Sequence, residues 1–479
     1  MLVVAATAVT GWEESGSLDQ RWLVVAPAGG HHRAKARLVG AGAKIVRDLA
    51  EIDTLVVEGG AAVEALARAD VELALAPLPP SGAGIASAGQ PAAPPPVVLP
   101  TQDEPYFPAQ WSLAAIEASG AWAHGQRGQG VRVAVLDTGV DGSHPELAGR
   151  INVGLARSFV EGQGWDVSLD GPTQADHGTH VAGIIAAADN GFGIVGVAPE
   201  AELVPISVLP RPSGHGPPDP VIAAIVYAAN IGADVINLSV DFSRFLRGGI
   251  NDRGTDDPSD DVAYTAREAA ALKLAFARAT LYAHHKGSTL VASGGNDGLD
   301  ADSDRTRYVV PRDAPHVLGI AATGPLGWAL DMSTELSRVA AFSDYGTSAI
   351  DLAAPGGNLD PALLASGALC PLGPVTLPCW FFDGVLSLAP VSGGLGFEFR
   401  RGTSMAAAHV SGVAALIIGS AGGRLDPDDV SRLLRASAVD RGEPGEDPHY
   451  GAGLVNARRA VELALADDRG RRCGWPGRR

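Results

Sequence analysis

The chain has 479 residues and a mass of 48.8 kDa, which suits about three ordinary domains or one large α/β domain with attachments. Aspartate and glutamate outnumber lysine and arginine by 54 to 36, and the net charge of −18 disfavours nucleic-acid binding by the chain as a whole. Hydrophobic residues make up 46% of the sequence, but no run of about 18 apolar residues predicts a membrane span. We therefore expect a globular protein with a large core.

The N-terminus and the cysteines bear on the cellular compartment. Residues 1–20 contain an apolar stretch and the small residues 6–8, but no positively charged segment precedes them, so we interpret them as a weak or truncated export signal. Three cysteines, Cys370, Cys379 and Cys473, are too few for a disulfide framework. The first two bracket a proline-rich loop, where a disulfide and a pair of free thiols both remain open.

Residues 21–77 have the pattern of a small independent domain. We expect strands at residues 22–26, 43–49, 54–58 and 71–76, and helices at residues 32–38 and 60–70. This β-α-β-β-α-β order predicts a ferredoxin-like α+β sandwich. Residues 78–104 follow and are rich in proline, alanine and glycine, so they predict an extended linker and the best domain boundary in the chain.

Residues 105–467 alternate strand-like and helical segments. Short β-branched runs occur at residues 131–136, 203–208, 235–238, 289–292 and 317–321. The alternation predicts a three-layer α/β domain, with a parallel sheet covered by helices on both faces. Two stretches interrupt it as insert-like loops, residues 243–261 and 356–399. The first is acidic and is either a cation-binding loop or a solvated one. Residues 468–479 are basic and predict a disordered tail.

Three segments place a reactive side chain at the end of a strand or the start of a helix. Asp137 ends a buried hydrophobic run, His177 begins a helix of small residues, and Ser404 stands at the entry to another such helix. A serine hydroxyl needs an adjacent base to become a nucleophile, and histidine can accept and return the proton. An aspartate on the other ring nitrogen fixes the histidine tautomer. Together the three residues predict a nucleophilic centre.

In this chain order, the three segments resemble the subtilisin-like serine proteases, or subtilases, for which the order Asp, His, Ser is known. The resemblance covers residues 110–466, and its most specific motifs are residues 177–183, HGTHVAG, and residues 402–406, GTSMA. It implies that Asp137 orients the histidine, that His177 is the general base and acid, and that Ser404 is the nucleophile. His180 is implied to be a structural second histidine.

The resemblance extends to the oxyanion and substrate sites. Asn296 is implied to be the oxyanion donor, together with the backbone N–H of Ser404. Three segments are implied to bind an extended peptide substrate. The peptide would pair with them as an added strand, and they would line the pocket for the residue before the cut. These substrate-binding residues are Ser213, Gly214, His215, Ser239, Val240, Asp241, Ser293, Gly294 and Gly295. Asp241 stands where the family has glycine, which favours basic or small side chains in the pocket.

A structural calcium ion is also implied by the resemblance. The segment at residues 188–194 matches the family's calcium loop in length, and oxygen ligands suit calcium. The implied ligands are the side chains of Glu146 and Asn190 and the carbonyls of Ala188, Phe192 and Ile194. A metal-free turn remains the alternative.

The function implied is that of a secreted serine endopeptidase, acting as a monomer through an acyl-enzyme. Residues 21–77 resemble a subtilase propeptide, which implies an autoprocessed zymogen cut between residues 76 and 106; a permanent accessory domain is the alternative. An inactive peptide-binding protein of the same fold is the competing function. An esterase of the α/β-hydrolase type is disfavoured because only His409 and His449 follow the serine. A zinc hydrolase using His177 and His180 lacks a matching carboxylate.

Overall fold

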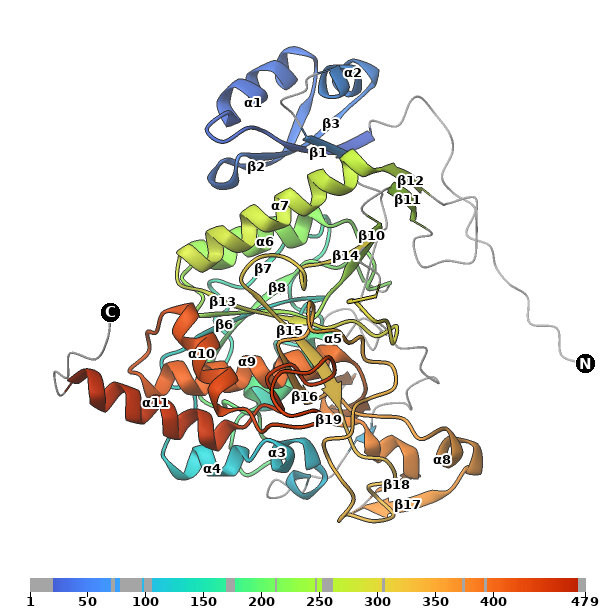
Figure 1. Cartoon of the computed structure of the whole chain (residues 1–479), viewed down its shortest axis with the longest axis vertical. Coiled ribbons are helices and arrows are strands. Elements are labelled where there is room, and N and C mark those ends of the chain that lie inside the picture. Colours follow the sequence, from blue (N-terminus) through green and yellow to red (C-terminus); the bar gives the residue numbers. More distant parts are fainter. Residues whose placement is uncertain are drawn as a thin grey trace, which may run out of the picture.

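The computed structural model describes residues 20–69, 74–77, 97–98, 106–168, 177–211, 213–245, 248–251, 262–303, 306–372, 375–391 and 394–472. Predictions on the export signal, on most of the linker and on the last seven residues lie outside these ranges. Within them, the molecule consists of a small N-terminal domain seated on a large α/β domain (Figure 1).

The N-terminal domain has the predicted β-α-β-β-α-β order. Its four described strands form an antiparallel sheet in the order β2-β3-β1-β4. Successive side chains of β1 point to opposite faces of this sheet. Trp22 and Val24 therefore pack under the helices of the domain, while Leu23 and Val25 face the larger domain. The elements are β1 Gln20–Val25, α1 His31–Gly40, β2 Lys44–Leu49, β3 Thr54–Gly59, α2 Ala61–Ala69 and β4 Ala74–Pro77.

The large domain is built on a parallel sheet. Its seven described strands lie in the order β16-β15-β13-β9-β6-β8-β7, and every pairing among them is parallel. The strands are β6 Arg132–Asp137, β7 Arg157–Ser158, β8 Glu202–Ser207, β9 Val235–Leu238, β13 Thr289–Ser293, β15 Val317–Thr323 and β16 Leu352–Pro355. Five of them coincide with the predicted runs; β7 and β16 are additional.

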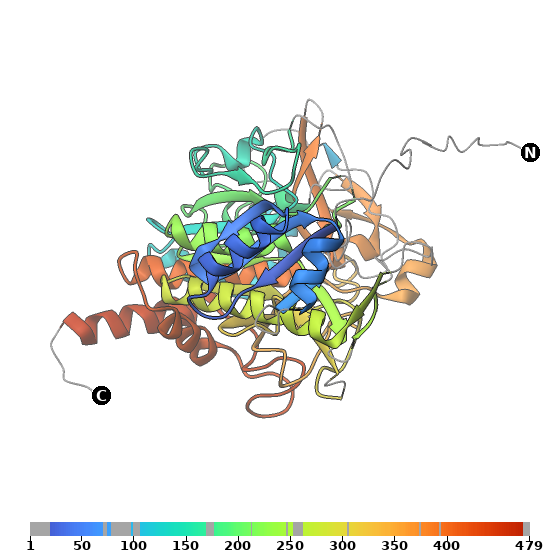
Figure 2. The ribbon, with the colours of Figure 1, turned by 90° about the horizontal axis from the view of Figure 1, so that it is seen from above.

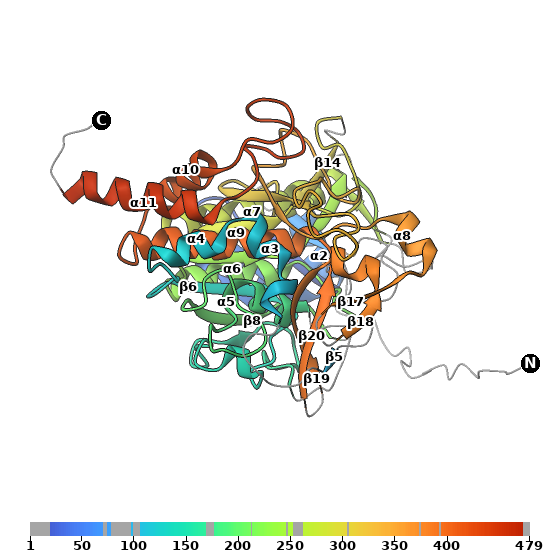
Figure 3. The same ribbon diagram turned by 90° about the horizontal axis from the view of Figure 1, so that it is seen from below.

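Helices cover both faces of the sheet, as predicted. One face carries α6 and α7, and the other carries α5 and α9 with α3, α4, α10 and α11 around them (Figure 3). The helices are α3 Trp111–Ala115, α4 Ala118–Ala123, α5 His177–Ala186, α6 Asp219–Asn230, α7 Ala266–His285, α9 Thr403–Ser420, α10 Pro427–Ser437 and α11 Ala457–Arg472. Among the described residues, α9 alone is long and apolar enough to cross a membrane, but 94% of it is buried in the core.

The two insert-like stretches are more regular than predicted. The first contains strands because Phe242 is buried against Phe276 of α7, which anchors β10 beside β14. The second contains two hairpins, and Cys370 and Cys379 form a disulfide across one of them. The elements are β10 Phe242–Phe245, β11 Gly248–Asn251, β12 Val262–Thr265, β14 Arg307–Val310, α8 Pro361–Ser366, β17 Leu369–Leu372, β18 Val375–Pro378, β19 Val385–Val391 and β20 Gly394–Arg400.

Two boundary predictions were wrong in part. Residues 468–472, expected in a disordered tail, continue α11, because the docked part of the helix supplies the nucleus on which further turns form. Within the predicted linker, Val97–Val98 forms β5 and pairs with Gly396 and Phe397 of β20. Two β-branched residues at an exposed strand edge favour this pairing.

The N-terminal domain lies on α6 and α7. Figure 2 shows its sheet covering these two helices. Side chains of β1, β2 and β3 share one hydrophobic cluster with them, including Leu23, Val25, Leu49 and Val56. The guanidinium of Arg278 on α7 donates to the carbonyl of Ala26 at 2.8 Å.

Candidate active site

A buried carboxylate and an imidazole meet at the carboxyl end of β6. Asp137 is fully buried, and its carboxylate lies 2.9 and 3.0 Å from Nδ1 of His177, the first residue of α5. The backbone N–H of Thr138 donates to the same carboxylate at 2.7 Å. An ideal Cβ on Gly178 would lie 2.1 Å from the carbonyl oxygen of Gly139, so only glycine lets the helix start this close to the strand. The arrangement places a proton on Nδ1 and leaves Nε2 to act as a base.

The candidate nucleophile stands at the start of α9. Ser404 is the second residue of this helix and follows Gly402, whose φ of 153° favours glycine. Helices α5 and α9 pack against each other, so His177 and Ser404 start neighbouring helices. Among the described residues, the Ser404 hydroxyl has no hydrogen-bond partner. Bonds between nucleophile and base are often long without substrate, so this geometry is compatible with catalysis.

A buried polar chain holds the backbone of the nucleophile. The Ser239 hydroxyl donates to the carbonyl of Ser404 at 3.1 Å and accepts from the Asn237 amide at 2.9 Å. The Ser411 hydroxyl, two turns along α9, donates to the Asn237 carbonyl oxygen at 2.9 Å. The carboxyl end of β9 is thereby fixed to the first two turns of α9. Sequence reasoning missed Asn237 and Ser411, because nothing local marks residues 174 positions apart as partners.

The predicted oxyanion donor is oriented by its neighbour in space. The side-chain oxygen of Asn296 accepts from the backbone N–H of Thr403 at 2.8 Å and from its hydroxyl at 3.0 Å. The Thr403 hydroxyl in turn accepts from the N–H of Gly295 at 3.1 Å. With its oxygen so engaged, the amide presents its N–H groups, and Nδ2 lies 3.6 Å from an ideal Cβ on Gly402. The donor thus faces the backbone that leads into Ser404.

A buried ion pair supports the turn that carries this amide. The Asp344 carboxylate accepts from the N–H groups of Asp297 and Leu299, both at 3.0 Å. The guanidinium of Arg312 lies 3.3 Å from the same carboxylate and donates to the carbonyl of Gly294 at 2.5 Å. Burial raises the pKa of Asp344, and the backbone N–H groups and Arg312 oppose that rise. This pair was not predicted, because its members are 32 residues apart and meet only in the folded chain.

Asp241 lies beside this turn, at the carboxyl end of the neighbouring strand β9. Its side chain is partly buried. Burial, and then the charges of Asp297 and Asp344, raise the pKa of the Asp241 carboxyl to about 7. Ser239, Val240, Ser293, Gly294 and Gly295 are buried around it.

In the opposite predicted substrate segment, Ser213 is exposed, His215 is half-buried and Gly214 is buried. Gly214 has a φ of +67° and donates to the carbonyl of Pro210 at 2.8 Å, while Nδ1 of His215 lies 2.7 Å from the carbonyl of Ser213. Arg211 ties this turn to the triad, because its guanidinium donates to the carbonyl of Thr138 at 2.8 Å. The segment is placed beside the Asp137 turn, and its contact with substrate stays a prediction.

The predicted cation ligands lie in and against one loop. Glu146 is fully buried, and an ideal Cβ on Gly193 would lie 2.1 Å from its carboxylate, so the loop closes tightly over that group. Asn190 is exposed at the loop tip, and Asp189 forms an ion pair with Arg127. The backbone of Ala188, Phe192 and Ile194 forms the remainder of the loop.

His180 and His409 are committed to carbonyl oxygens in the core. Nε2 of His180 lies 3.1 and 3.2 Å from the carbonyls of Val385 and Glu398, so His180 joins α5 to the β19–β20 hairpin. Burial lowers the pKa of His180 well below its usual value and that of His409 to about 4. His409 bonds to the carbonyl of Met405 in its own helix, which removes it as a base for an esterase.

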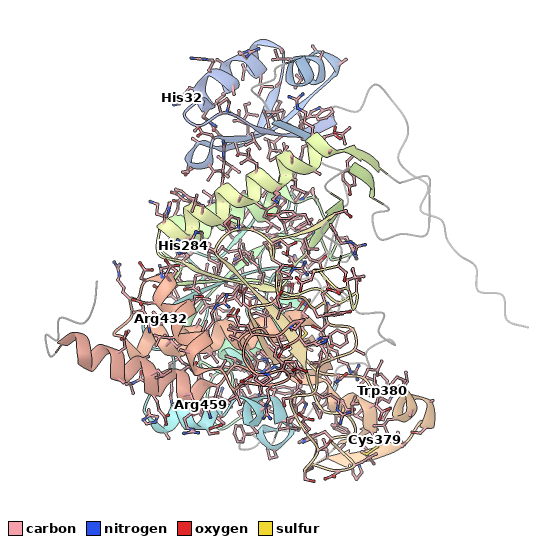
Figure 4. The ribbon with its side chains drawn as sticks, viewed as in Figure 1. His32, His284, Cys379, Trp380, Arg432 and Arg459 are labelled. Carbon is pink, nitrogen blue, oxygen red and sulfur yellow. A yellow bond between two sulfur atoms is a disulfide. The ribbon has the colours of Figure 1, made fainter. Side chains whose placement is uncertain are left out.

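One histidine cluster lies elsewhere. Among the described residues, His284, His316 and Asp428 are the group whose side chains could share a metal ion, with ligand atoms within 4.8 Å of one another. Figure 4 shows His284 at the end of α7, on the other side of the molecule from Cys379. The cluster therefore stands apart from the disulfide hairpin and plays no part in the triad.

Aspartate, histidine and serine at the ends of core elements, with an amide facing the serine, define a serine hydrolase of the acyl-transfer type. Residues 128–453 match the model of the subtilase family, and the chain belongs to that family. It is a subtilisin-like serine endopeptidase.

Curated relatives match most of this chain. Fervidolysin of Fervidobacterium pennivorans is 32% identical over 362 residues, which cover 74% of this chain and 44% of fervidolysin. Thermitase of Thermoactinomyces vulgaris is 32% identical, over 76% of this chain and 99% of thermitase. Subtilisin Savinase of Lederbergia lenta is 31% identical, over 73% and 98%. The chain thus spans less than half of fervidolysin but nearly all of the two shorter enzymes.

Solved structures share the fold. A lanthipeptide protease is 26% identical with a TM-score of 0.57, over 75% of this chain and 95% of that one. The epidermin leader peptide processing serine protease of Staphylococcus aureus is 22% identical with a TM-score of 0.69, over 94% of this chain and 99% of that one. At that identity the second likeness concerns the fold alone.

Proposed function

We propose that the protein is a secreted endopeptidase made as an autoprocessed zymogen, with residues 21–77 as its intramolecular inhibitor. The docking of the N-terminal sheet on α6 and α7 carries this proposal. Arg47 of β2 reaches across and donates to the fully buried carboxylate of Asp219 at 2.6 Å. A buried, charge-paired contact of this kind suits a domain that binds specifically. Because the linker joins this domain covalently to the protease, the domain would act as an inhibitor in cis.

The chemistry follows from the site. His177 takes the Ser404 proton as the hydroxyl attacks the substrate carbonyl, and Asp137 stabilises the imidazolium that forms. The negative charge on the carbonyl oxygen falls between the Asn296 amide and the N–H of Ser404, where the helix terminus adds its positive end. His177 then protonates the leaving amine, and water repeats the sequence to release the acyl group.

The position of β5 narrows the place of processing. Val97–Val98 pairs with β20, and β20 ends four residues before Ser404. A cut between residues 78 and 96 would sever the covalent link to the N-terminal domain while leaving β5 on the protease. We expect processing in that interval.

A structural calcium ion would be held by Glu146, Asn190 and the three loop carbonyls. Two features favour this: a carboxylate buried inside a loop of positive-φ glycines, and a ligand set made only of oxygen. When bound, the ion would neutralise the buried Glu146 and order the loop. It takes no part in the peptide cleavage.

Secretion is supported by the disulfide between Cys370 and Cys379, because such bonds persist in oxidising compartments.

The test compares the full-length wild type with Ser404→Ala. At 48.8 kDa for 479 residues, a residue weighs about 0.10 kDa, so a cut between residues 78 and 96 should remove about 8–10 kDa from the N-terminus of the wild type. The mutant should stay intact, because it lacks the nucleophile. Equal processing of both proteins would assign the cut to another protease. Stability of the wild-type chain under conditions where it cleaves peptides would favour a permanent accessory domain.

A further inference from the structure

Asp241 stands between the two segments that form the substrate pocket. Strands β9 and β13 are parallel neighbours, and Leu238 pairs with Ala292, so three further residues bring Asp241 beside Gly295. On its other side, Phe242 pairs with Val310, which places Asp241 next to the end of β14. Asp241 therefore lies beside the turn that carries Asn296, at the predicted pocket for the residue before the scissile bond.

Three carboxylates surround this pocket, and they differ in what neutralises them. Asp344 accepts two backbone N–H groups and faces Arg312. Asp297 is 69% exposed to water, with Arg307 at 4.0 Å. In the part of the chain that the structure describes, Asp241 has neither a hydrogen bond nor an ion pair. It is the one carboxylate of the three that is partly buried and uncompensated.

Arg312 does not supply the missing charge. Its guanidinium is committed to Asp313 at 2.7 Å, to the carbonyl of Gly294 at 2.5 Å and to Asp344 at 3.3 Å. The side chain is only 4% exposed, so it cannot turn toward the pocket without leaving the buried Asp344 carboxylate without its cation. The pocket therefore has a negative potential at its entrance.

Burying a charged carboxylate without a partner costs free energy, and this cost raises the pKa of Asp241. A cationic side chain of the ligand would offset the cost by pairing with the carboxylate. A small neutral side chain would leave the charge uncompensated, so its binding would gain nothing from Asp241.

We propose that Asp241 is a specificity residue that pairs with the lysine or arginine side chain immediately before the scissile bond. This specificity role rests on the proposed protease activity, so the experiments below test the specificity and the activity separately. The preferred substrates are then proteins with exposed basic residues in extended segments.

The linker lacks the basic residues that this specificity would require at a cleavage site. No lysine or arginine occurs between Arg68 and Arg127, so the linker offers no preferred site to other copies of the enzyme. Processing in cis at a neutral residue remains accessible, because the tether raises the effective concentration of the linker at the active site. Asp241→Asn should lose its preference for basic substrates.

The experiment uses the processed enzyme and peptide substrates that differ only before the cut, at arginine, citrulline, lysine, leucine and alanine. Citrulline has the shape of arginine without its charge. We expect kcat/KM to favour arginine over citrulline by about 30-fold or more, the low end for a buried charge pair. Asp241→Asn should reduce the ratio to about 3-fold or less, and Asp241→Glu should restore part of it.

Asp297→Asn is the matched control, because it removes an equal charge nearby from an exposed position; we expect it to keep most of the arginine preference. The same arginine-to-citrulline ratio in the wild type and Asp241→Asn, or a wild-type preference for leucine, would overturn the proposal.

If no peptide is cleaved at all, the proposed protease activity is wrong. The pocket assignment is then tested by measuring peptide binding. Ser404→Ala should bind a peptide ending in arginine at least about 10-fold more tightly than one ending in citrulline, and Asp241→Asn should abolish the difference. Equal affinities in Ser404→Ala would overturn the pocket assignment independently of catalysis.

Discussion

At the scale of single residues, orientation matters more than the presence of reactive groups. Asp137, His177 and Ser404 are each common residue types, and the neighbours that aim them distinguish this site. Thr403 engages the oxygen of Asn296, and Ser239 engages the backbone of Ser404. Both helpers act through hydrogen bonds shorter than 3.2 Å that are buried from water, where such bonds are strongest.

Removing the oxyanion amide should slow the chemical step. We expect Asn296→Ala to reduce kcat by about 10²–10³, the loss recorded for the equivalent donor in subtilisin itself. KM should change little, because the donor acts on charge that exists only in the transition state. Steady-state rates divided by the titrated concentration of active serine check this. A normal kcat in Asn296→Ala would contradict the assignment.

The charge on Asp241 should make selectivity depend on pH. The groups that act on it are Asp297 and Asp344, which raise its pKa, and Arg312, which lowers it; burial is the largest cause of the rise to about 7. Below that pH the carboxyl is neutral, and above it the carboxylate attracts a cation. The ratio of kcat/KM for arginine over citrulline peptides should therefore rise between pH 6 and pH 8, an interval of about one unit on either side of the pKa.

The ratio cancels any pH effect on activity that both substrates share. Asp241→Asn should give a ratio that is flat with pH. A wild-type ratio that does not change across this interval would show that Asp241 is not the group that discriminates.

At the scale of elements, the site depends on two helix starts meeting the carboxyl ends of a parallel sheet. Helix α5 approaches β6 through Gly178, and α9 is fixed to β9 through the polar chain at Asn237. These contacts explain why the motifs contain small residues. A larger residue at position 178 would separate the histidine from its aspartate.

Calcium binding should be visible in thermal stability. At a calcium concentration about 100-fold above Kd, removing calcium should lower Tm by about 3–4 °C for a domain of this size. Glu146→Gln should lose this response, because it removes the one buried carboxylate of the loop. Asp189→Asn is the control, since it removes a carboxylate that is paired with Arg127, and its response should remain. Equal Tm values with calcium and with chelator in the wild type would remove the metal from the account.

The sequence predicted the elements whose patterns are local. The runs ending at Asp137 and Leu238 appeared as buried strands because their apolar residues are contiguous. The hairpin at β19 and β20 was missed, since glycine and proline surround it and its pairing is visible only once His180 and Ser387 join it to α5. The Arg312–Asp344 pair was missed for the same reason, because its partners meet only in the folded chain.

At the scale of the whole molecule, the N-terminal domain covers one helical face of the protease. It meets α6 and α7 with apolar side chains and with the buried ion pair between Arg47 and Asp219. This contact is separate from the triad, which lies at the ends of the strands. The domain can therefore remain bound after the linker is cut.

Breaking the buried pair across this contact should release the N-terminal fragment. Arg47→Ala leaves the Asp219 carboxylate buried without its partner, at a cost of about 3–5 kcal/mol while the domain is docked. The fragment should then separate from the processed protease on size-exclusion chromatography at concentrations where the wild-type pair coelutes. Lys35→Ala, which loses an exposed ion pair with Asp48 inside the domain, should coelute like the wild type.

The central claim is that Ser404 is a nucleophile activated by His177 and Asp137. A fluorophosphonate tests it most directly, because an activated serine displaces its fluoride and keeps the phosphonyl group. Intact-mass spectrometry of the native wild type should show one adduct per chain, and peptide mapping should place it on Ser404. Ser404→Ala and His177→Ala should remain unlabelled. An unlabelled wild type, or an adduct on a different serine, would contradict the account.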